Sequence, residues 1–224
     1  MDTVYSSSPW VVPPDPETTA DIFRRLGRPV TLRARSLINF GSEQKVYLLQ
    51  TGIAATFVGG VGSYERMAAI FTAGSTLGAV KAMTHRGIRM DLQARIYREA
   101  RALQVDTSQF MRELDRDPKA CAAAAVNFVL KNEATVDGLL LNGLLKIPER
   151  LARMITLLCR LDGTPLTNAW QPLPDCFTVT DLSTMIHSNR VTVSRVLARW
   201  AKDGLIRFEE GEWLFNSGLE RAFG

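Results

Sequence analysis

The chain has 224 residues, of which 46% are hydrophobic and 22% are charged, and its formal net charge is +4 with a pI near 9.1. This size and composition argue against a disordered protein and allow one large or two modest globular domains. The small positive charge favours an anionic partner such as DNA, although a solvated basic surface would explain it equally well. The sequence shows neither a signal peptide nor the ~18 apolar residues of a membrane span, so we expect a cytoplasmic protein with no membrane partner.

Three cysteines and two histidines are the residues to consider for metal binding or nucleophilic catalysis: Cys121, Cys159, Cys176, His85 and His187. The cysteines lie far apart and form no Cys-x-x-Cys pair, so we expect no metal site and no resident cofactor. Neither histidine lies in a motif with a serine or cysteine nucleophile, which argues against an enzyme. In a reducing compartment the cysteines are predicted to be buried thiols, with a redox sensor as the alternative.

The first part of the chain predicts an extended arm followed by a β-rich domain. Four prolines between residues 9 and 16 disfavour a regular helix, and a short helix is expected around residues 19–26. Short apolar runs follow at residues 46–50, 53–58 and 67–71. Glycines separate these runs, as is typical of strands joined by tight turns in a compact β-sandwich or barrel.

A long helix is predicted from Pro118 to about Lys146, because Asp117 suits an N-cap and proline suits the first turn, although Gly138 and Gly143 weaken it locally. Apolar residues recur along it at helical spacing and form one stripe: Val126, Val129, Val136, Leu140 and Leu144. Such a helix of about 29 residues would be about 43 Å long, more than a domain of this size can cover. We therefore expect the stripe to pair with a second copy in a homodimer; the alternative is a helix laid across its own β-domain.

Ile147 and Pro148 predict a hinge after the long helix, because proline disfavours helical geometry in the preceding residue and removes a backbone donor. An amphipathic helix follows this hinge. A proline-rich loop at residues 165–174 then leads to the C-terminal segment.

Residues 177–200, FTVTDLSTMIHSNRVTVSRVLARW, predict two helices with a tight turn between them. Thr180 is expected to cap the first helix, and Ser188 or Asn189 the second. The apolar side chains expected to face inward are Leu182, Met185, Ile186, Val193, Val196, Leu197 and Trp200. The second helix would then present outward Arg190, Val191, Ser194, Arg195 and Arg199, a surface suited to the major groove of DNA.

A hairpin is expected after this pair of helices. Gly204 is a suitable left-handed stop for the second helix, and two strands are predicted at residues 205–209 and 212–215, turning at Glu210 and Gly211. The hairpin would be the wing of a winged helix-turn-helix. The alternative, a structural helical hairpin with a solvated basic face, does not account for the cap, the spacing and the wing together.

These features resemble the family of the cyclic-AMP receptor protein and the fumarate-nitrate reduction regulator (CRP/FNR). The resemblance covers nearly the whole chain and depends on the long helix, on NRVTVSRVL at residues 189–197, and on the glycines Gly41, Gly52, Gly74 and Gly78. It implies an α+β protein with a cupin-like β-roll sensor, a dimerisation helix and a C-terminal winged helix-turn-helix. We therefore expect the arm and β-roll at residues 1–116, the dimerisation helix at 117–147 and the DNA-binding domain at 148–224.

The resemblance also implies double-stranded DNA and RNA polymerase as partners. In this family the positions matching Arg190, Ser194 and Arg195 contact DNA, and the whole predicted interface is Ser188, Asn189, Arg190, Val191, Thr192, Ser194, Arg195 and Arg199. Most relatives have glutamate where this chain has Val191; glutamate accepts from cytosine, whereas valine offers only apolar contact to a thymine methyl. A palindromic, A·T-rich operator is therefore expected, and VTVSRVL is similar to the halorespiration regulators, which sense chlorinated aromatics. His187 replaces the usual turn glycine, at a position where a positive φ is expected.

The effector pocket departs from that of the cyclic-AMP receptors. There a turn glycine is followed by glutamate and later by Arg-Ser or Arg-Ala, whereas here Ala79 follows Gly78, and Met90 and Asp91 match the later pair. A shift of one residue would place Arg89 at the phosphate clamp, so the missing glutamate carries the argument against cyclic AMP. The cysteine cluster of the oxygen-sensing relatives is missing too, which argues against an iron–sulfur cluster.

Family architecture places four residues at the effector pocket: Gly78, Lys81, Lys131 and Thr135. The two lysines would suit a small anionic aromatic effector such as a phenolate; the alternative is that both are solvated. A ligand-independent architectural DNA-binding protein is the competing function, but it would need no β-rich sensor domain.

Overall fold

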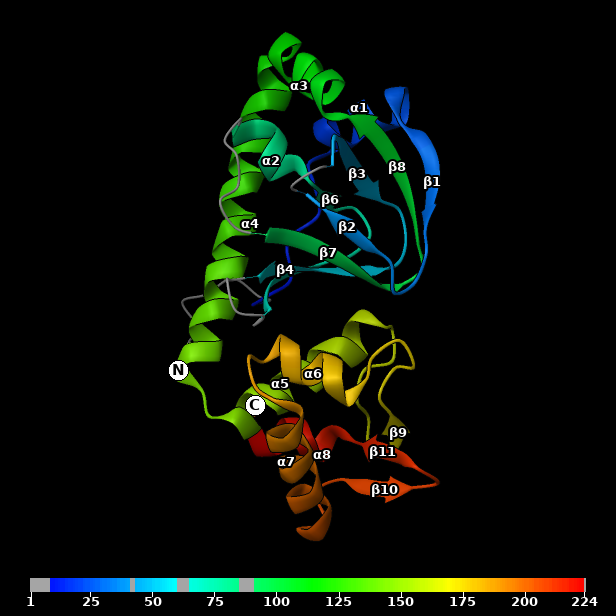
Figure 1. The fold of residues 1–224 in the computed structure, drawn as a ribbon, viewed down its shortest axis with the longest axis vertical. Helices are drawn as coiled ribbons and strands as arrows, with labels where there is room; N and C mark the ends of the chain where they lie inside the picture. Colours follow the sequence, from blue (N-terminus) through cyan, green and yellow to red (C-terminus); the bar gives the residue numbers. More distant parts are fainter. Residues whose placement is uncertain (1–8, 41–42, 60–64, 85–90, 224) are drawn as a thin grey trace. The chain divides into compact units, whose positions relative to one another are not determined.

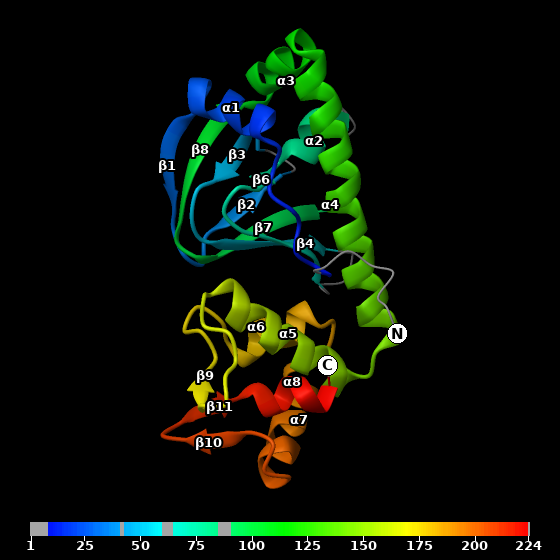
Figure 2. The same ribbon diagram turned by 180° about the vertical axis from the view of Figure 1, so that it is seen from behind.

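The computed structural model describes residues 9–40, 43–59, 65–84 and 91–223, and it divides into two units at Leu140 (Figure 1, Figure 2). Several residues of the sequence analysis lie outside the described residues: Gly41, His85, Arg89, Met90 and the side chains of Lys81 and Asp91. No helix in the described ranges is both long and apolar enough to cross a membrane.

Within the described residues, two four-stranded antiparallel sheets form the first unit. One has the order β1-β8-β3-β6, with β1 Arg28–Leu32, β8 Ala100–Asp106, β3 Lys45–Leu49 and β6 Thr76–Leu77. The other has the order β2-β7-β4-β5, with β2 Leu37–Asn39, β7 Asp91–Arg98, β4 Ile53–Gly59 and β5 Arg66–Phe71. The three apolar runs predicted as strands are confirmed as β3, β4 and β5.

The two sheets bury an apolar core, and glycine turns let their strands approach closely. Leu49, Leu77 and Ile96 are each at most 1% exposed in this core. Gly52, in the turn between β3 and β4, has φ of 93°, and a Cβ there would lie 2.5 Å from the Cβ of Ala100. Only glycine therefore allows this turn to pass so close to β8.

Among the described residues, four helices complete the first unit: α1 Glu17–Leu26, α2 Ala79–Thr84, α3 Thr107–Arg116 and α4 Pro118–Leu144. The short helix predicted around residues 19–26 is confirmed as α1, whereas α2 and α3 were not predicted. Helices α1 and α3 pack through Phe23 and Phe110, whose ring centroids lie 5.4 Å apart. The long helix α4, which ends just before the expected Lys146, runs along one side of the sheets (Figure 1, Figure 2).

The N-terminal arm lies between β5 and α4. The backbone N–H of Trp10 donates to the carbonyl of Ala134 in α4 at 3.0 Å, and the carbonyl of Trp10 accepts from Ile70 in β5 at 2.6 Å. The Trp10 side chain is 1% exposed and packs against Gly138 of α4. The glycine that weakens the helix locally therefore makes room for the indole of the arm.

Gly138→Ala is expected to lower the free energy of unfolding by roughly 1–3 kcal/mol, the usual cost of overpacking a buried site. A Cβ at this position would lie 2.2 Å from Cδ1 of Trp10, so the indole would have to move. Gly143→Ala is the matched control, because no atom lies within 4 Å of its added Cβ and helix propensity should stabilise that variant by about 1 kcal/mol. Thermal unfolding measures both; an unchanged melting temperature for Gly138→Ala would contradict the packing of Trp10.

The described residues of the second unit form four helices and a small antiparallel sheet. The helices are α5 Ile147–Leu161, α6 Val179–Met185, α7 Arg190–Lys202 and α8 Ser217–Phe223. The sheet has the order β10-β11-β9, with β10 Arg207–Glu209, β11 Glu212–Phe215 and β9 Gln171–Pro172. Leu151, Ile155, Leu182 and Leu219 are each at most 1% exposed in its core. The predicted helix pair and wing are confirmed as α6, α7, β10 and β11.

The break between α4 and α5 falls at Leu145 and Lys146, slightly before the predicted hinge. Ile147 is already helical, so the prediction of non-helical geometry there is wrong. Pro148 lies in the first turn of α5, where its missing donor costs nothing. The N–H of Lys146 donates to Oε2 of Glu149 at 2.9 Å, which caps this start. The proline therefore begins one helix rather than ending the other.

None of the three cysteines forms a disulfide, and only Cys159 is buried. Cys121 is exposed and Cys176 is half-buried, so the prediction of three buried thiols is wrong for Cys121. Burial raises the pKa of the Cys159 thiol to about 12, which leaves it unreactive at neutral pH. In the part of the chain that the structure describes, no group of three His, Cys, Asp or Glu side chains could hold a metal ion.

Candidate nucleic-acid interface and ligand pocket

Side-chain caps set the start of α6 and α7. Oγ1 of Thr178 accepts from the N–H of Asp181 at 3.2 Å, and Oδ2 of Asp181 accepts from the N–H of Thr178 at 2.8 Å. Thr180 lies within α6, so the prediction that it is the cap is wrong. For α7, Oδ1 of Asn189 accepts from the N–H of Thr192 at 2.8 Å, which decides between the two predicted caps.

The turn between α6 and α7 brings the two helices close together. His187 has φ of 55°, which confirms the positive φ expected where relatives have glycine. The N–H of Ser188 donates to the carbonyl of Ser183 in α6 at 2.8 Å. This bond fixes the direction in which the chain enters α7.

Helix α7 buries one face and exposes the other. Val193, Leu197 and Trp200 are at most 4% exposed, as predicted, while Val196 is only half-buried. The exposed side chains are Arg190, Val191, Ser194, Arg195 and Arg199, also as predicted. A shallow groove along this outer face is lined by Arg190, Val191, Ser194, Arg195 and Ala198. Guanidinium and hydroxyl donors thus lie beside one exposed apolar side chain.

The wing turns at Glu210 and Gly211, whose φ angles of 52° and 88° are both positive, as a type I′ hairpin turn requires. Gly204, with φ of 73°, ends α7 as predicted. The tip of the wing is acidic, because Glu209, Glu210 and Glu212 are all exposed. These carboxylates would repel phosphates, whereas the outer face of α7 has the exposed arginines Arg190, Arg195 and Arg199.

A hydrogen-bond network that the sequence analysis missed joins the end of α4 to the end of α6. Nη1 of Arg150 donates to the carbonyl of Asn142 at 2.6 Å and to the carbonyl of Ile186 at 2.9 Å. Nδ2 of Asn142 donates to the carbonyl of Met185 at 3.2 Å. Burial lowers the pKa of Arg150 below its ordinary value, and guanidinium groups nevertheless stay charged in proteins. One cation therefore bonds to the ends of two helices.

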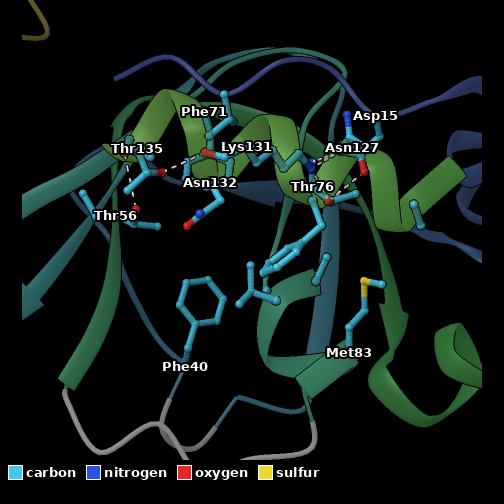
Figure 3. A pocket seen from close by; sticks show the side chains of 18 of the residues that line it. Asp15, Phe40, Thr56, Phe71, Thr76, Met83, Asn127, Lys131, Asn132 and Thr135 are labelled. Carbon is cyan, nitrogen blue, oxygen red and sulfur yellow. Dashed lines mark hydrogen bonds and ion pairs between the residues drawn. The ribbon is translucent and has the colours of Figure 1, made fainter. Parts of the chain in front are cut away.

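A cavity of about 220 Å³ lies in the first unit, between the sheets and α4 (Figure 3). Most of its lining is apolar and includes Val12, Phe40, Phe71, Met83, Leu92, Phe110 and Phe128. Three of the four predicted effector residues, Gly78, Lys131 and Thr135, also line it. The fourth, Lys81, has its backbone in α2, and its side chain lies outside the described residues.

Lys131 does not present a free charge to this cavity. Its Nζ lies 2.5 Å from Oδ2 of Asp15 in the arm and 2.9 Å from Oγ1 of Thr76 in β6 (Figure 3). The side chain of Lys131 is 9% exposed, so the alternative that it is solvated is wrong. Burial lowers the pKa of Lys131, and the carboxylate of Asp15 acts in the opposite direction. The ion pair removes one of the two cations on which the prediction of an anionic effector depends.

The other two predicted pocket residues have clear local roles. Oγ1 of Thr135 donates to the carbonyl of Lys131 at 2.9 Å, so its oxygen can still accept a hydrogen bond. Gly78 has φ of 86°, and an added Cβ would lie 3.1 Å from both the carbonyl oxygen of Lys45 and Cε1 of Phe40. A larger residue at Gly78 would therefore be strained and would press on the pocket wall.

The apolar stripe predicted on α4 is exposed in the single chain. The exposed fractions are 63% for Val126, 56% for Val129, 41% for Val136, 44% for Leu140 and 78% for Leu144. Leu130 and Leu139, which the sequence analysis missed, add to this surface. On the opposite face of α4, Ala120 and Ala124 lie in the core of the first unit, and the buried Ala134 accepts a backbone hydrogen bond from Trp10 of the arm. The helix is thus laid across its own β-domain and still leaves the stripe uncovered.

Comparison with known proteins finds a family match for the second unit and structural matches for the fold of both units. Residues 149–215 match the model of the Crp-like helix-turn-helix domain. Among solved structures, the chain is similar to the regulator CLP from Xanthomonas campestris, with a TM-score of 0.73 and 13% identity over 88% of this chain and 98% of that one. A CRP/FNR-family transcriptional regulator from Thermus thermophilus matches with a TM-score of 0.67 and 16% identity, over 88% of this chain and 98% of that one. No curated protein matches the sequence significantly.

A structure of CprK complexed with OCPA is similar as well, with a TM-score of 0.61 and 14% identity over 97% of this chain and 100% of that one. It is one of several distantly similar structures, so the structural comparison does not specifically support the predicted likeness to the halorespiration branch. At these identities the structures establish the fold, and the domain match establishes the helix-turn-helix. These two findings show that residues 149–215 form a Crp-like helix-turn-helix domain and that the chain shares its fold with solved regulators, one of them described as a CRP/FNR-family transcriptional regulator.

Proposed function

We propose that this protein is a DNA-binding transcription regulator of the CRP/FNR family, which reads DNA with the outer face of α7, acts as a homodimer on a palindromic A·T-rich operator, and responds to a small molecule in the cavity of the first unit. The observation that supports this most is the outer face of α7, where two exposed arginines and a serine lie around Val191, which is 59% exposed. Recognition helices of this motif enter the major groove with their N-terminal residues. Residues 1–116 would sense, 117–147 would pair two copies, and 148–224 would bind DNA.

Each residue of the predicted DNA interface has a proposed role. Arg190 and Arg195 suit guanine or phosphate, because a guanidinium bonds bidentately to either, and Ser194 suits a base or phosphate oxygen. Ser188, Asn189 and Thr192 lie at the N-terminal end of the helix, where backbone N–H groups and the helix dipole favour phosphate. Arg199, with a side chain 82% exposed, is proposed to contact phosphate one turn further on. RNA polymerase is proposed as a further protein partner.

The homodimer is proposed to form along the apolar stripe of α4. Contiguous exposed apolar side chains of this extent mark an interaction surface rather than a solvated helix face. A two-fold axis along the stripe would relate two copies of α7, as the two halves of a palindrome require.

The proposed effector is a small aromatic molecule, which the phenylalanine-rich lining of the cavity supports. CLP is a c-di-GMP-responsive regulator and CprK has been solved in complex with OCPA, so regulators of this fold do bind small molecules. The alternative function, a ligand-independent architectural DNA-binding protein, offers no reason for such a cavity beside α4.

Selection from randomised duplexes tests the proposed function. The wild type is expected to enrich a palindrome with A·T-rich half-sites, and Val191→Glu to change one position of each half-site from A·T to G·C. The expected preference is roughly 1–3 kcal/mol, because a glutamate accepts from N4 of cytosine. Val191→Ala is the control, since it removes the apolar contact without adding an acceptor and should relax that position only. No enrichment by the wild type would contradict DNA reading, and identical motifs would place Val191 away from the bases.

A further inference from the structure

We propose that the cavity beside α4 selects an uncharged, single-ring aromatic ligand, because the Asp15 carboxylate occupies the position at Lys131 and Thr76 that an anionic group would take. This inference rests on the proposed effector role of the cavity and specifies the chemical class of its ligand. Three observations support it. Lys131, the only cation among the described lining residues, is already paired; hydrogen bonds fix the backbone and the side chain of Asp15; and the remaining walls are apolar and enclose a small volume.

The described lining has one cation, Lys131, and its charge is already paired. Nζ of Lys131 lies 2.5 Å from Oδ2 of Asp15 and donates to Oγ1 of Thr76 at 2.9 Å. The same Oδ2 accepts from the N–H of Thr76 at 2.7 Å, and Oδ1 of Asp15 accepts from Oγ1 of Thr76 at 3.1 Å. The Asp15 side chain, 5% exposed, thus makes the contacts that a ligand carboxylate or phosphate would need.

Asp15 is fixed by its backbone as well as by its side chain. Its N–H donates to the carbonyl of Gly74 at 2.7 Å, and Nδ2 of Asn127 in α4 donates to the carbonyl of Pro14 at 2.8 Å. An anionic ligand would therefore have to pull the arm away from both β-domain and α4. If it did not, its charge would lie beside a buried carboxylate, where repulsion is strong because the surroundings are poorly polarisable.

The size and remaining chemistry of the cavity suit one neutral ring. Its volume of about 220 Å³ exceeds the roughly 150 Å³ of an apolar cavity that binds benzene and is below the roughly 300–1,000 Å³ of drug-sized sites. Phe40 and Phe71 supply aromatic walls, and Asn132 and Thr135 supply neutral polar groups from α4 (Figure 3). A substituted ring with a hydroxyl or amide would match this lining, whereas the phosphate of a cyclic nucleotide would bring an unmatched charge.

Calorimetry with matched pairs of ligands tests this on the full-length protein at pH 7. The probes are benzamide against benzoate and 4-chlorobenzyl alcohol against 4-chlorobenzoate, which differ mainly in charge. The wild type is expected to bind the neutral member of each pair at least about tenfold more tightly, a difference of about 1.4 kcal/mol. Tighter binding of the carboxylates by the wild type would overturn the inference.

Two variants make the role of Asp15 specific. Asp15→Asn removes the internal anion and leaves the ammonium of Lys131, so affinity for both carboxylates should rise at least about tenfold relative to the neutral probes. The double variant Asp15→Asn with Lys131→Met has neither charge and should again prefer the neutral probes. Circular dichroism checks that each variant folds; if Asp15→Asn does not, the wild type and the double variant still decide.

Failure of the inference and failure of the proposed function give different results. Unchanged carboxylate affinity in folded Asp15→Asn would show that Asp15 does not exclude anions. No binding of any probe to the wild type or either variant would instead remove the cavity from the proposed function, and this inference with it. DNA selection by α7 is measured separately and would stand in both cases.

Discussion

Arg195→Ala is expected to abolish sequence-specific operator binding while leaving the fold intact. Arg195 is exposed on the outer face of α7 and lines its groove, so truncation removes a guanidinium without opening a cavity in the core. One bidentate contact to guanine contributes roughly 1–3 kcal/mol of discrimination. A dimer carries two copies, so the loss should be roughly 2–6 kcal/mol, or roughly 30-fold to 10⁴-fold in affinity.

The control for this variant is Arg153→Ala, which removes the same charge from an exposed position on α5. It should weaken binding to specific and random duplexes equally and only slightly, because it changes the general field and no base contact. Gel-shift titrations of both variants at one salt concentration, with circular dichroism as a check on folding, measure the difference. Equal losses for the two variants would remove Arg195 from the interface.

Leu140→Asp is expected to convert a dimer into monomers. Leu140 lies in the exposed apolar stripe of α4, and a two-fold seam there would bury one new carboxylate from each copy without a partner. Operator affinity should also fall, by roughly 10²–10⁴-fold, because the two half-sites would no longer be bound by linked domains. Sedimentation velocity at micromolar concentration reports the mass, and gel shift reports the affinity.

Leu37→Asp is the matched control for the dimer. Leu37 is an exposed leucine of similar accessibility in β2, away from α4, and its replacement makes the same chemical change. This variant should keep the mass of the wild type. A wild type that is monomeric at micromolar concentration, or a Leu140→Asp variant that stays dimeric, would contradict the proposed seam.

Local patterns predicted the elements whose signals lie within a few residues of one another. The exposed and buried faces of α7 follow from the spacing of Val193, Leu197 and Trp200, and the wing turn follows from Glu210 and Gly211. The cap of α6 was misplaced by two residues because two threonines compete. The capping box decides for Thr178, since Asp181 stands three residues after it and bonds back to its N–H. That signal was readable in the sequence.

The pocket chemistry could not be predicted in the same way. Asp15 and Lys131 are separated by 116 residues, so their pairing depends on how the arm is laid along α4. A lysine in isolation is far more often solvated than buried, and nothing adjacent to Lys131 indicates its partner. The stripe on α4 was readable as a pattern, whereas its exposure depends on which helix face the β-domain covers. Local sequence therefore identified the stripe, and the family resemblance identified the pocket region, but neither indicated the charge state of the pocket.

The two hydrogen bonds that Nη1 of Arg150 donates link the last turn of α4 to the C-terminal end of α6. A movement of the last turn of α4 must either carry the C-terminal end of α6 with it or break a charge-assisted hydrogen bond. Such a bond contributes about 1.5–3 kcal/mol, which is comparable to the roughly 1–3 kcal/mol typical of the free energy that couples two binding sites. The carbonyl of Ile186 immediately precedes the turn that orients α7. Under the proposed function, a rotation of α4 would therefore be transmitted toward α7 through Arg150 and Asn142, with an energy in the range of reversible control.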